Sequence, residues 1–99
     1  MPWFASAVDE YQRIDALVKA MMVADGLGMI AEQGWRPLVN GDFARTYGTR
    51  VVVVMHRGEG DAVEWRLVGG PRNMVWHRDV RDAVRSAETW VRRQMKGGG

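Results

Sequence analysis

The pattern of apolar and polar positions predicts a helix near each end of the chain. From Val8 to Met22, apolar side chains recur at steps of three and four, the spacing of one face of an α-helix. A second stripe of this kind runs through residues 80–95. Ser6 and Asp9 have the spacing of a capping box, and Asp79 is suited to cap the second stripe. We therefore expect one helix that starts near Ser6 and another that starts after Asp79.

The first helical pattern falters at residues 25–28, which contain two glycines. Two glycines inside a helix cost about 1 kcal/mol each relative to alanine. We favour a break at Asp25 to Gly28, with Asp25 capping a short helix over residues 29–33 and Gly34 ending it. A kinked but continuous helix is the alternative.

Between the two helices the sequence has the pattern of strands. Residues 50–56 include four consecutive valines, whose branched side chains favour a pleated backbone. Because no polar residue interrupts the valines, we expect a central strand that is buried on both faces. A hairpin turn is expected at residues 40–42, which read Asn-Gly-Asp. Shorter strands are expected at residues 35–39, 43–47, 63–67 and 73–77.

This order of elements predicts an α+β fold. It would consist of the broken N-terminal helix, an antiparallel meander of three to five strands, and a C-terminal helix packed on the sheet, with both apolar stripes buried on one face. Ninety-nine residues fit one domain. We place that domain at residues 1–96 and expect a flexible glycine tail at residues 97–99.

Charge is distributed unevenly along the chain. Residues 1–35 hold five acidic and two basic side chains, whereas residues 36–99 hold twelve basic and seven acidic ones. The chain has no cysteine, which excludes a disulfide framework and a thiolate zinc site and fits a cytoplasmic protein. No apolar run approaches the ~20 residues of a membrane helix, so we expect no contact with a membrane. The N-terminal residues lack the features of a signal peptide.

Arginine and tryptophan supply the candidate contact residues. A row of bases on the C-terminal helix could bind phosphates or an acidic protein patch, although Asp79, Asp82 and Glu88 partly neutralise it. Two tryptophans flank the starts of a helix and a strand and are candidate surface anchors, whereas Trp65, Trp76 and Trp90 are in phase with the core. The predicted partner-binding residues are Arg78, Arg81, Arg85, Arg92, Arg93, Lys96, Trp3 and Trp35.

A group of three methionines is a candidate for a second contact surface. Met21, Met22 and Met29 cluster near the end of the first helix, where core packing is the default interpretation. If the sheet cannot bury these residues together with Leu27, a twofold homodimer through the N-terminal helices would cover them.

No motif of catalysis, cofactor binding or metal ligation is present. His56 and His77 match no zinc spacing, and Gly26 and Gly28 lack the third glycine and the preceding strand of a dinucleotide-binding loop. We therefore expect a protein that is not an enzyme, with no catalytic residue, cofactor or metal ion.

Two resemblances bear on function. The order of helix, strands and helix resembles the double-stranded-RNA-binding domain, but residues 70–73 read Gly-Pro-Arg-Asn where that family has a histidine, and residues 79–82 are acidic where it has lysines. The short chain, with Gly34-Trp35, Trp65-Arg66-Leu67 and a closing helix, resembles in overall form the small accessory proteins of phages and mobile elements, including anti-CRISPR proteins. That second resemblance implies a protein that occupies a surface of a larger machine.

We therefore expect a small non-enzymatic binding protein that occupies a surface of a larger protein or nucleoprotein complex. The most specific form of this prediction is an inhibitor of a bacterial defence complex of the CRISPR type. The alternative is a nucleic-acid-binding protein that uses the arginines of the C-terminal helix, which predicts affinity that falls steeply with salt.

Overall fold

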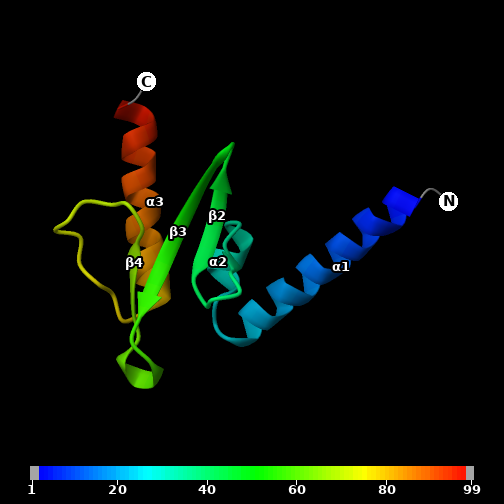
Figure 1. Ribbon diagram of the computed structural model, residues 1–99, viewed down its shortest axis with the longest axis horizontal. Coiled ribbons are helices and arrows are strands. Elements are labelled where there is room, and N and C mark those ends of the chain that lie inside the picture. Colours follow the sequence, from blue (N-terminus) through cyan, green and yellow to red (C-terminus); the bar gives the residue numbers. More distant parts are fainter. Residues whose placement is uncertain (1–2, 98–99) are drawn as a thin grey trace. The chain divides into compact units, whose positions relative to one another are not determined.

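The computed structural model describes residues 3–97, and the surroundings of the side chains of residues 7–96. Two N-terminal helices, a four-stranded antiparallel sheet and a C-terminal helix follow one another, so the predicted α+β arrangement is confirmed (Figure 1). The chain divides into two compact units, Met1–Arg36 and Pro37–Gly99, here called the helical unit and the sheet unit. That the two form one domain, as the length predicts, stays a prediction.

The helical unit contains α1 (Trp3–Ala24) and α2 (Gly28–Glu32). The predicted break between them is confirmed. Gly26 has φ 79°, a conformation that glycine adopts without steric cost, and the Leu27 N–H donates to the Met22 carbonyl at 2.7 Å. The backbone therefore turns out of α1 before α2 begins.

Two details of the predicted caps were wrong. α1 begins at Trp3, so Ser6 lies inside the helix rather than at its start; the alanines at positions 5 and 7 favour a helix, and no breaker separates them from Trp3. Asp25 does not cap α2, because Leu27 occupies the N-cap position and makes no side-chain capping bond. Gly34, with φ 104°, follows the C-cap of α2 as expected.

The sheet has the order β1-β2-β3-β4. Its strands are β1 (Arg36–Pro37), β2 (Phe43–Tyr47), β3 (Arg50–Arg57) and β4 (Glu64–Leu67), with a 3-10 turn at Gly60–Ala62. β3 pairs antiparallel with β2 and β4, so that Val54 lies opposite both Phe43 and Leu67. The valine run is thus an interior strand, as predicted.

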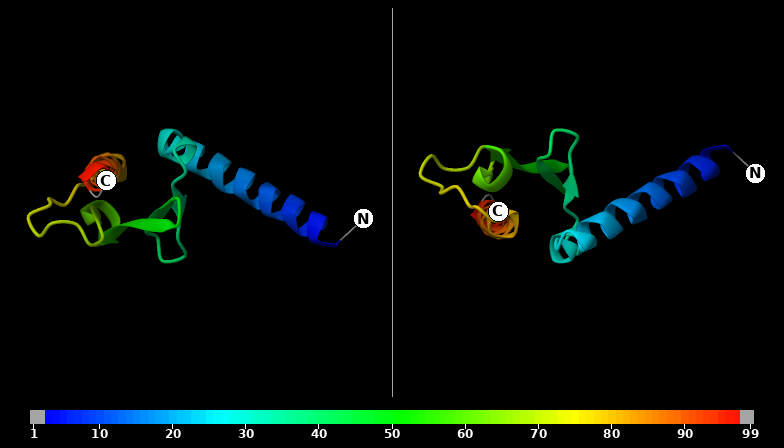
Figure 2. Two further views of the ribbon diagram at one scale, coloured as in Figure 1. Left: turned by 90° about the horizontal axis from the view of Figure 1, so that it is seen from above. Right: turned by 90° about the horizontal axis from the view of Figure 1, so that it is seen from below.

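α3 (Val80–Gly97) packs on β3 and β4, and Figure 2 shows it on one side of these strands from above and from below. The Arg81 N–H donates to the Asp79 carboxylate at 2.9 Å, so Asp79 is the predicted N-cap. The apolar side chains buried in the sheet unit are Phe43, Val52, Val54, Leu67, Val80, Ala83, Val84, Ala87 and Val91, and the charged Glu88 is buried among them. Among residues 3–97, no helix is long and apolar enough to cross a membrane.

Three expectations for the sheet unit need correction. β3 is not buried on both faces: Val52 and Val54 are buried, whereas Val51 is 63% exposed, because an antiparallel sheet covered by a helix on one face leaves alternate side chains uncovered. Residues 73–77 form no strand, and only His77 bridges to Trp65. Gly97, assigned to the tail, is the last residue of α3, and residues 98–99 lie outside the described part.

Candidate binding groove

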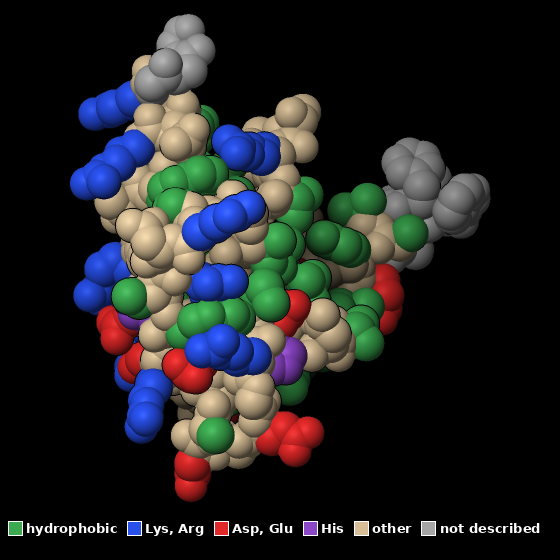
Figure 3. Space-filling model, turned by 60° about the vertical axis from the view of Figure 1, so that its left-hand side comes forward, with side chains coloured by type: hydrophobic (Ala, Val, Ile, Leu, Met, Phe, Trp, Pro, Cys, Tyr) green, Lys and Arg blue, Asp and Glu red, His purple; other side chains and the backbone are tan. Residues whose placement is uncertain are grey.

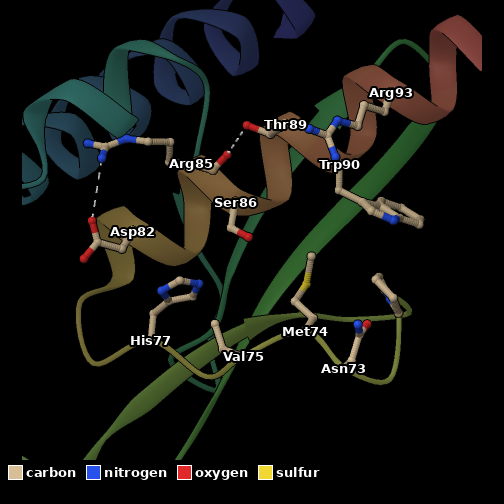
Figure 4. A pocket seen from close by; sticks show the side chains of 11 residues that line it. Asn73, Met74, Val75, His77, Asp82, Arg85, Ser86, Thr89, Trp90 and Arg93 are labelled. Atoms are coloured by element: carbon tan, nitrogen blue, oxygen red, sulfur yellow. Dashed lines mark hydrogen bonds and ion pairs between the residues drawn. The ribbon is translucent and has the colours of Figure 1, made fainter.

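A groove in the sheet unit lies between α3 and the loop that connects β4 to it (Figure 4). Its volume is about 780 Å³, which is within the range of sites that hold a ligand or a partner side chain. The loop is irregular because it begins at Gly69-Gly70-Pro71, and its far end is fixed by the His77–Trp65 backbone pair at 2.7 and 2.8 Å. The lining residues are Pro71, Asn73, Met74, Val75, His77, Asp82, Arg85, Ser86, Thr89, Trp90 and Arg93.

The apolar part of the groove comes from both elements. Met74 and Val75 project from the loop, and the half-buried Trp90 projects from α3 (Figure 4). Gly70 permits this arrangement, because a Cβ there would come within 3.1 Å of the Met74 sulfur and 3.2 Å of Leu67. Trp90 was expected in the core, and that expectation was wrong: its ring is a wall of the groove.

The polar part of the groove lies along α3. The Thr89 hydroxyl donates to the Arg85 carbonyl at 3.0 Å, and an Arg85 nitrogen lies 3.8 Å from an Asp82 oxygen. Arg93 has no ion pair with any residue that the structure describes, and it borders the same space as Trp90. An unpaired guanidinium beside an indole is therefore available to a partner.

His77 adds a further polar group beneath the groove. Its Nε2 is buried and makes no hydrogen bond within residues 3–97, and His77 lines the groove together with Asp82 and Ser86 (Figure 4). A buried nitrogen without a partner costs about 1–3 kcal/mol.

The predicted row of bases divides into distinct environments. Figure 3 shows Lys and Arg side chains spread along one face, with apolar surface between them. Arg85 and Arg93 line the groove, while Arg92, Arg93 and Lys96 line a second hollow of about 400 Å³ with Thr89 and Met95 at the end of α3. Arg78 and Arg81 are exposed and line neither hollow.

Three of these bases are already paired with acids. Arg81 binds Asp79 at 2.6 Å, and the hydrogen bond from the Arg81 side chain holds the pKa of Asp79 below its usual value. Arg92 lies 3.5 Å from Glu88, which confirms the predicted pair, and Arg85 is the third, beside Asp82. The row therefore presents less free positive charge than the sequence indicates.

The tryptophans are distributed differently from the prediction. Trp35 was expected to be a surface anchor, but it is fully buried, so that expectation was wrong. The side chain of Trp3, the other predicted anchor, lies outside the described residues. Trp65 and Trp76 were assigned to the core, yet both are only half-buried. The guanidinium groups of Arg57 and Arg66 lie 4.0 and 4.4 Å from the centre of the Trp76 ring.

A buried ion pair between α3 and the sheet was missed from the sequence. Glu88 is 5% exposed, and one of its carboxylate oxygens accepts a bond from Arg45 at 3.1 Å. Arg45 also donates to the Tyr47 hydroxyl and stacks on its ring. Burial, together with the Glu88 carboxylate, raises the pKa of Tyr47. Since 43 positions separate Arg45 from Glu88, only the folded structure brings them together.

The hairpin turn before β2 holds a second polar cluster. One Asp42 oxygen accepts the His56 backbone N–H at 2.9 Å and lies 2.5 Å from the His56 ring Nδ1. Burial works to raise the pKa of Asp42, but the hydrogen bonds from His56 and Asn40 outweigh it and lower that pKa. His56 thus joins β3 to the turn and lies apart from the groove, whereas His77 lines it.

The groove brings together the residue types of a hydrolytic triad without their geometry. Ser86, His77 and Asp82 all line it, but no hydrogen bond joins them in the described part of the chain, and Asp82 is instead the neighbour of Arg85. No group of three or more His, Asp or Glu side chains that could hold a metal ion occurs within the described residues.

Comparisons of the chain with protein-family models, with curated proteins and with solved structures find no match. The groove is therefore interpreted from its own residues.

Proposed function

We propose that this chain is a non-enzymatic binding protein that uses the groove of the sheet unit to bind a protein partner. The partner surface would combine an acidic group, placed to meet Arg93, with an apolar side chain, placed to fill the space between Met74 and Trp90. The second hollow at the end of α3, with Arg92 and Lys96, extends the same contact surface. The proposal takes the protein to be cytoplasmic, as its cysteine-free sequence led us to expect.

One observation carries this proposal: Arg93 has no acid partner among the described residues and borders a half-exposed Trp90. Tryptophan, arginine and methionine are enriched at protein interfaces, and tryptophan and arginine are also enriched among hot spots. Such an anchor gives a large apolar contact together with a bidentate bond to a carboxylate.

Charge favours a protein over a nucleic acid. Asp79 and Asp82 interrupt the row of bases and neutralise Arg81 and Arg85. Few free bases are therefore left to follow a phosphate backbone, whereas a single carboxylate needs only Arg93. The Trp76 ring already stacks with two guanidinium groups, which makes it a poor platform for a base. Direct binding of nucleic acid by Arg78, Arg81 and their neighbours is therefore the alternative outcome of the test.

The target named from the sequence, a bacterial defence complex of the CRISPR type, stays a prediction. The absence of enzymatic activity is likewise part of the proposal. Turnover of any substrate in the groove, for example through Ser86 and His77, would contradict it.

The test is a capture experiment from bacterial lysate with three forms of the full chain: the unmodified protein, Arg93→Glu and Arg50→Glu. Both arginines are exposed, and neither has an ion pair in the described residues, but only Arg93 lines the groove. We expect a protein that survives nuclease treatment and high salt, and whose recovery falls at least about tenfold with Arg93→Glu, because the charge reversal removes about 1.4 kcal/mol or more of binding free energy.

The matched variant decides the interpretation. Arg50→Glu changes net charge by the same amount outside the groove, so it should leave the recovery within about twofold of the unmodified protein. Equal loss with both variants, or capture only of material that nuclease and salt remove, would contradict the proposal. Capture only of material that nuclease and salt remove would favour the alternative, nucleic-acid binding by α3.

A further inference from the structure

α1 carries a stripe of exposed apolar side chains along most of its length. Tyr11 is 74% exposed, Leu17 59% and Met21 68%, and Val8 and Ile14 are each about half exposed. Single exposed apolar residues are common on proteins. A continuous row of five is not, and such a row is typical of a surface that another molecule covers.

The helical unit does not supply that cover. α2 has five residues. Among the α1 side chains that the structure describes, residues 7–24, Met22 is the buried one, and it lies near one edge of the stripe. On that same side Asp15 binds the Arg36 guanidinium at 2.8 Å, which lowers the pKa of Asp15. The unit thus occupies one side of α1 and leaves the row of Tyr11, Ile14, Leu17 and Met21 uncovered.

Tyr11, Ile14 and Met21 of the stripe belong to a coiled-coil repeat together with Ala7 and Val18, and Val8 and Leu17 flank that repeat. Ala7, Tyr11, Ile14, Val18 and Met21 follow one another at steps of four, three, four and three, so they occupy alternating a and d positions of successive heptads. A helix with this pattern is complementary to a second helix of the same pattern, because knobs from each fill holes in the other.

We propose that two copies of this chain pair through α1, side by side and antiparallel. In the antiparallel register, Tyr11 of one copy lies opposite Ile14 of the other, and Ala7 lies opposite Val18. At these four core positions an apolar side chain then faces an apolar side chain. The twofold axis makes the two halves of the contact identical, as in most homodimers.

The charges beside the stripe select the orientation. In a parallel pair, the position of Glu10 lies next to that of Asp15 in the other helix, and this contact of like charges occurs twice. In the antiparallel pair, Glu10 lies beside Leu17 and Asp15 beside Val8, so no acid faces an acid. Antiparallel pairing therefore has the lower electrostatic cost.

The area is sufficient for a modest dimer. The five exposed side chains contribute about 100 Å² each, so a pair buries roughly 1,000 Å² in total, at the lower end of specific interfaces. A lipid surface is a poorer occupant, because helices that lie on membranes are rich in Lys and Arg, whereas α1 carries three acids and two bases.

The oligomeric state of the full chain tests the proposal, and it does so independently of the groove. Light scattering over a range of concentrations should give twice the monomer mass. Ile14→Glu should raise the concentration at which half the chains are paired by at least about tenfold, because it places a charge in the centre of the apolar contact. Gln12→Glu adds the same charge to the opposite face of α1 and should leave this concentration unchanged.

Disulfide formation tests the orientation, since the chain has no cysteine of its own. An antiparallel pair separates the two copies of position 7 by about 16 Å along the helices, too far for a disulfide. Ala7→Cys alone should therefore not cross-link, whereas a mixture of Ala7→Cys and Val18→Cys chains should form a disulfide between the two.

Several results would overturn the proposal. A monomer at every concentration would mean that α1 pairs with no second copy. Equal effects of Ile14→Glu and Gln12→Glu would remove the stripe from the contact. Rapid cross-linking of Ala7→Cys with itself would show a parallel pair, and binding of the monomer to anionic vesicles in preference to self-association would assign the stripe to lipid.

Discussion

At the scale of single residues, the surroundings of each polar side chain decide its role. Asp42 is held by His56 on a neighbouring strand, and Arg93 is held by no acid that the structure describes. Asp42 therefore has a structural role, whereas Arg93 is free to serve as the contact residue that we propose, although both side chains are charged.

The depressed pKa of Asp42 predicts how stability depends on pH. A carboxyl whose pKa is lower in the folded than in the unfolded state stabilises the fold above its unfolded value of about 3.9, and that contribution is lost as the pH falls through the folded value. The free energy of unfolding should therefore decrease on acidification below about pH 4. Asp42→Asn should flatten this decrease and cost about 1–2 kcal/mol at neutral pH.

Denaturant unfolding of the two forms between pH 2 and pH 7 measures this effect. Asp61→Asn is the matched control, because Asp61 is exposed in the 3-10 turn and has no hydrogen bond or ion pair from its side chain among the described residues. If Asp61→Asn flattens the profile as much as Asp42→Asn does, the hydrogen bonds to His56 are not the cause.

The tryptophans show what can be predicted for a residue and what cannot. Periodicity gives the face on which a side chain lies, but not how deep that face is buried. Trp90 follows the stripe of α3 and still borders the groove, because the loop beside it leaves space. Trp35 stands next to a glycine at an element boundary, where no periodicity applies, and it is fully buried.

At the scale of elements, local sequence signals predict where helices and strands begin and end, but they do not predict contacts between residues far apart in the sequence. The break after α1, the bounds of β2 and the start of α3 follow from glycine, turn residues and a capping aspartate within a few positions. The strand expected at residues 73–77 does not form, because this segment makes a single bridge to the sheet, between His77 and Trp65. The groove exists because this segment is a loop, so the sequence could not predict it.

The contact between α3 and β2 depends on the Arg45–Glu88 pair. Glu88→Ala leaves the partly buried Arg45 guanidinium without its carboxylate, which should lower the free energy of unfolding by about 2–3 kcal/mol. Glu64→Ala removes the more exposed pair with Arg57, at 3.4 Å, and should cost less than about 1 kcal/mol.

Thermal or denaturant unfolding of these two variants compares the pairs directly. Both substitutions remove a carboxylate that pairs with arginine. Glu88 also pairs with the exposed Arg92 at 3.5 Å, which adds less than about 1 kcal/mol, so a larger difference than that reports the burial of the Arg45–Glu88 pair. Similar losses of stability for Glu88→Ala and Glu64→Ala would mean that the pair on α3 is not a specific contact.

At the scale of the whole molecule, charge and apolar surface are divided between the two units. The helical unit has five acids and three bases, and the sheet unit has seven acids and eleven bases. The first offers the stripe of α1, and the second offers the groove with Arg93. A protein with two such surfaces is suited to pair with a second copy through one and to bind a partner through the other.

The central claim is that the groove of the sheet unit is the surface that binds the partner. A photoreactive amino acid at position 89, inside the groove, should form an adduct with the captured partner protein in lysate. The same group at position 61, in the exposed 3-10 turn, should form little. Adducts from position 61 alone, or equal yields from both positions, would contradict the account.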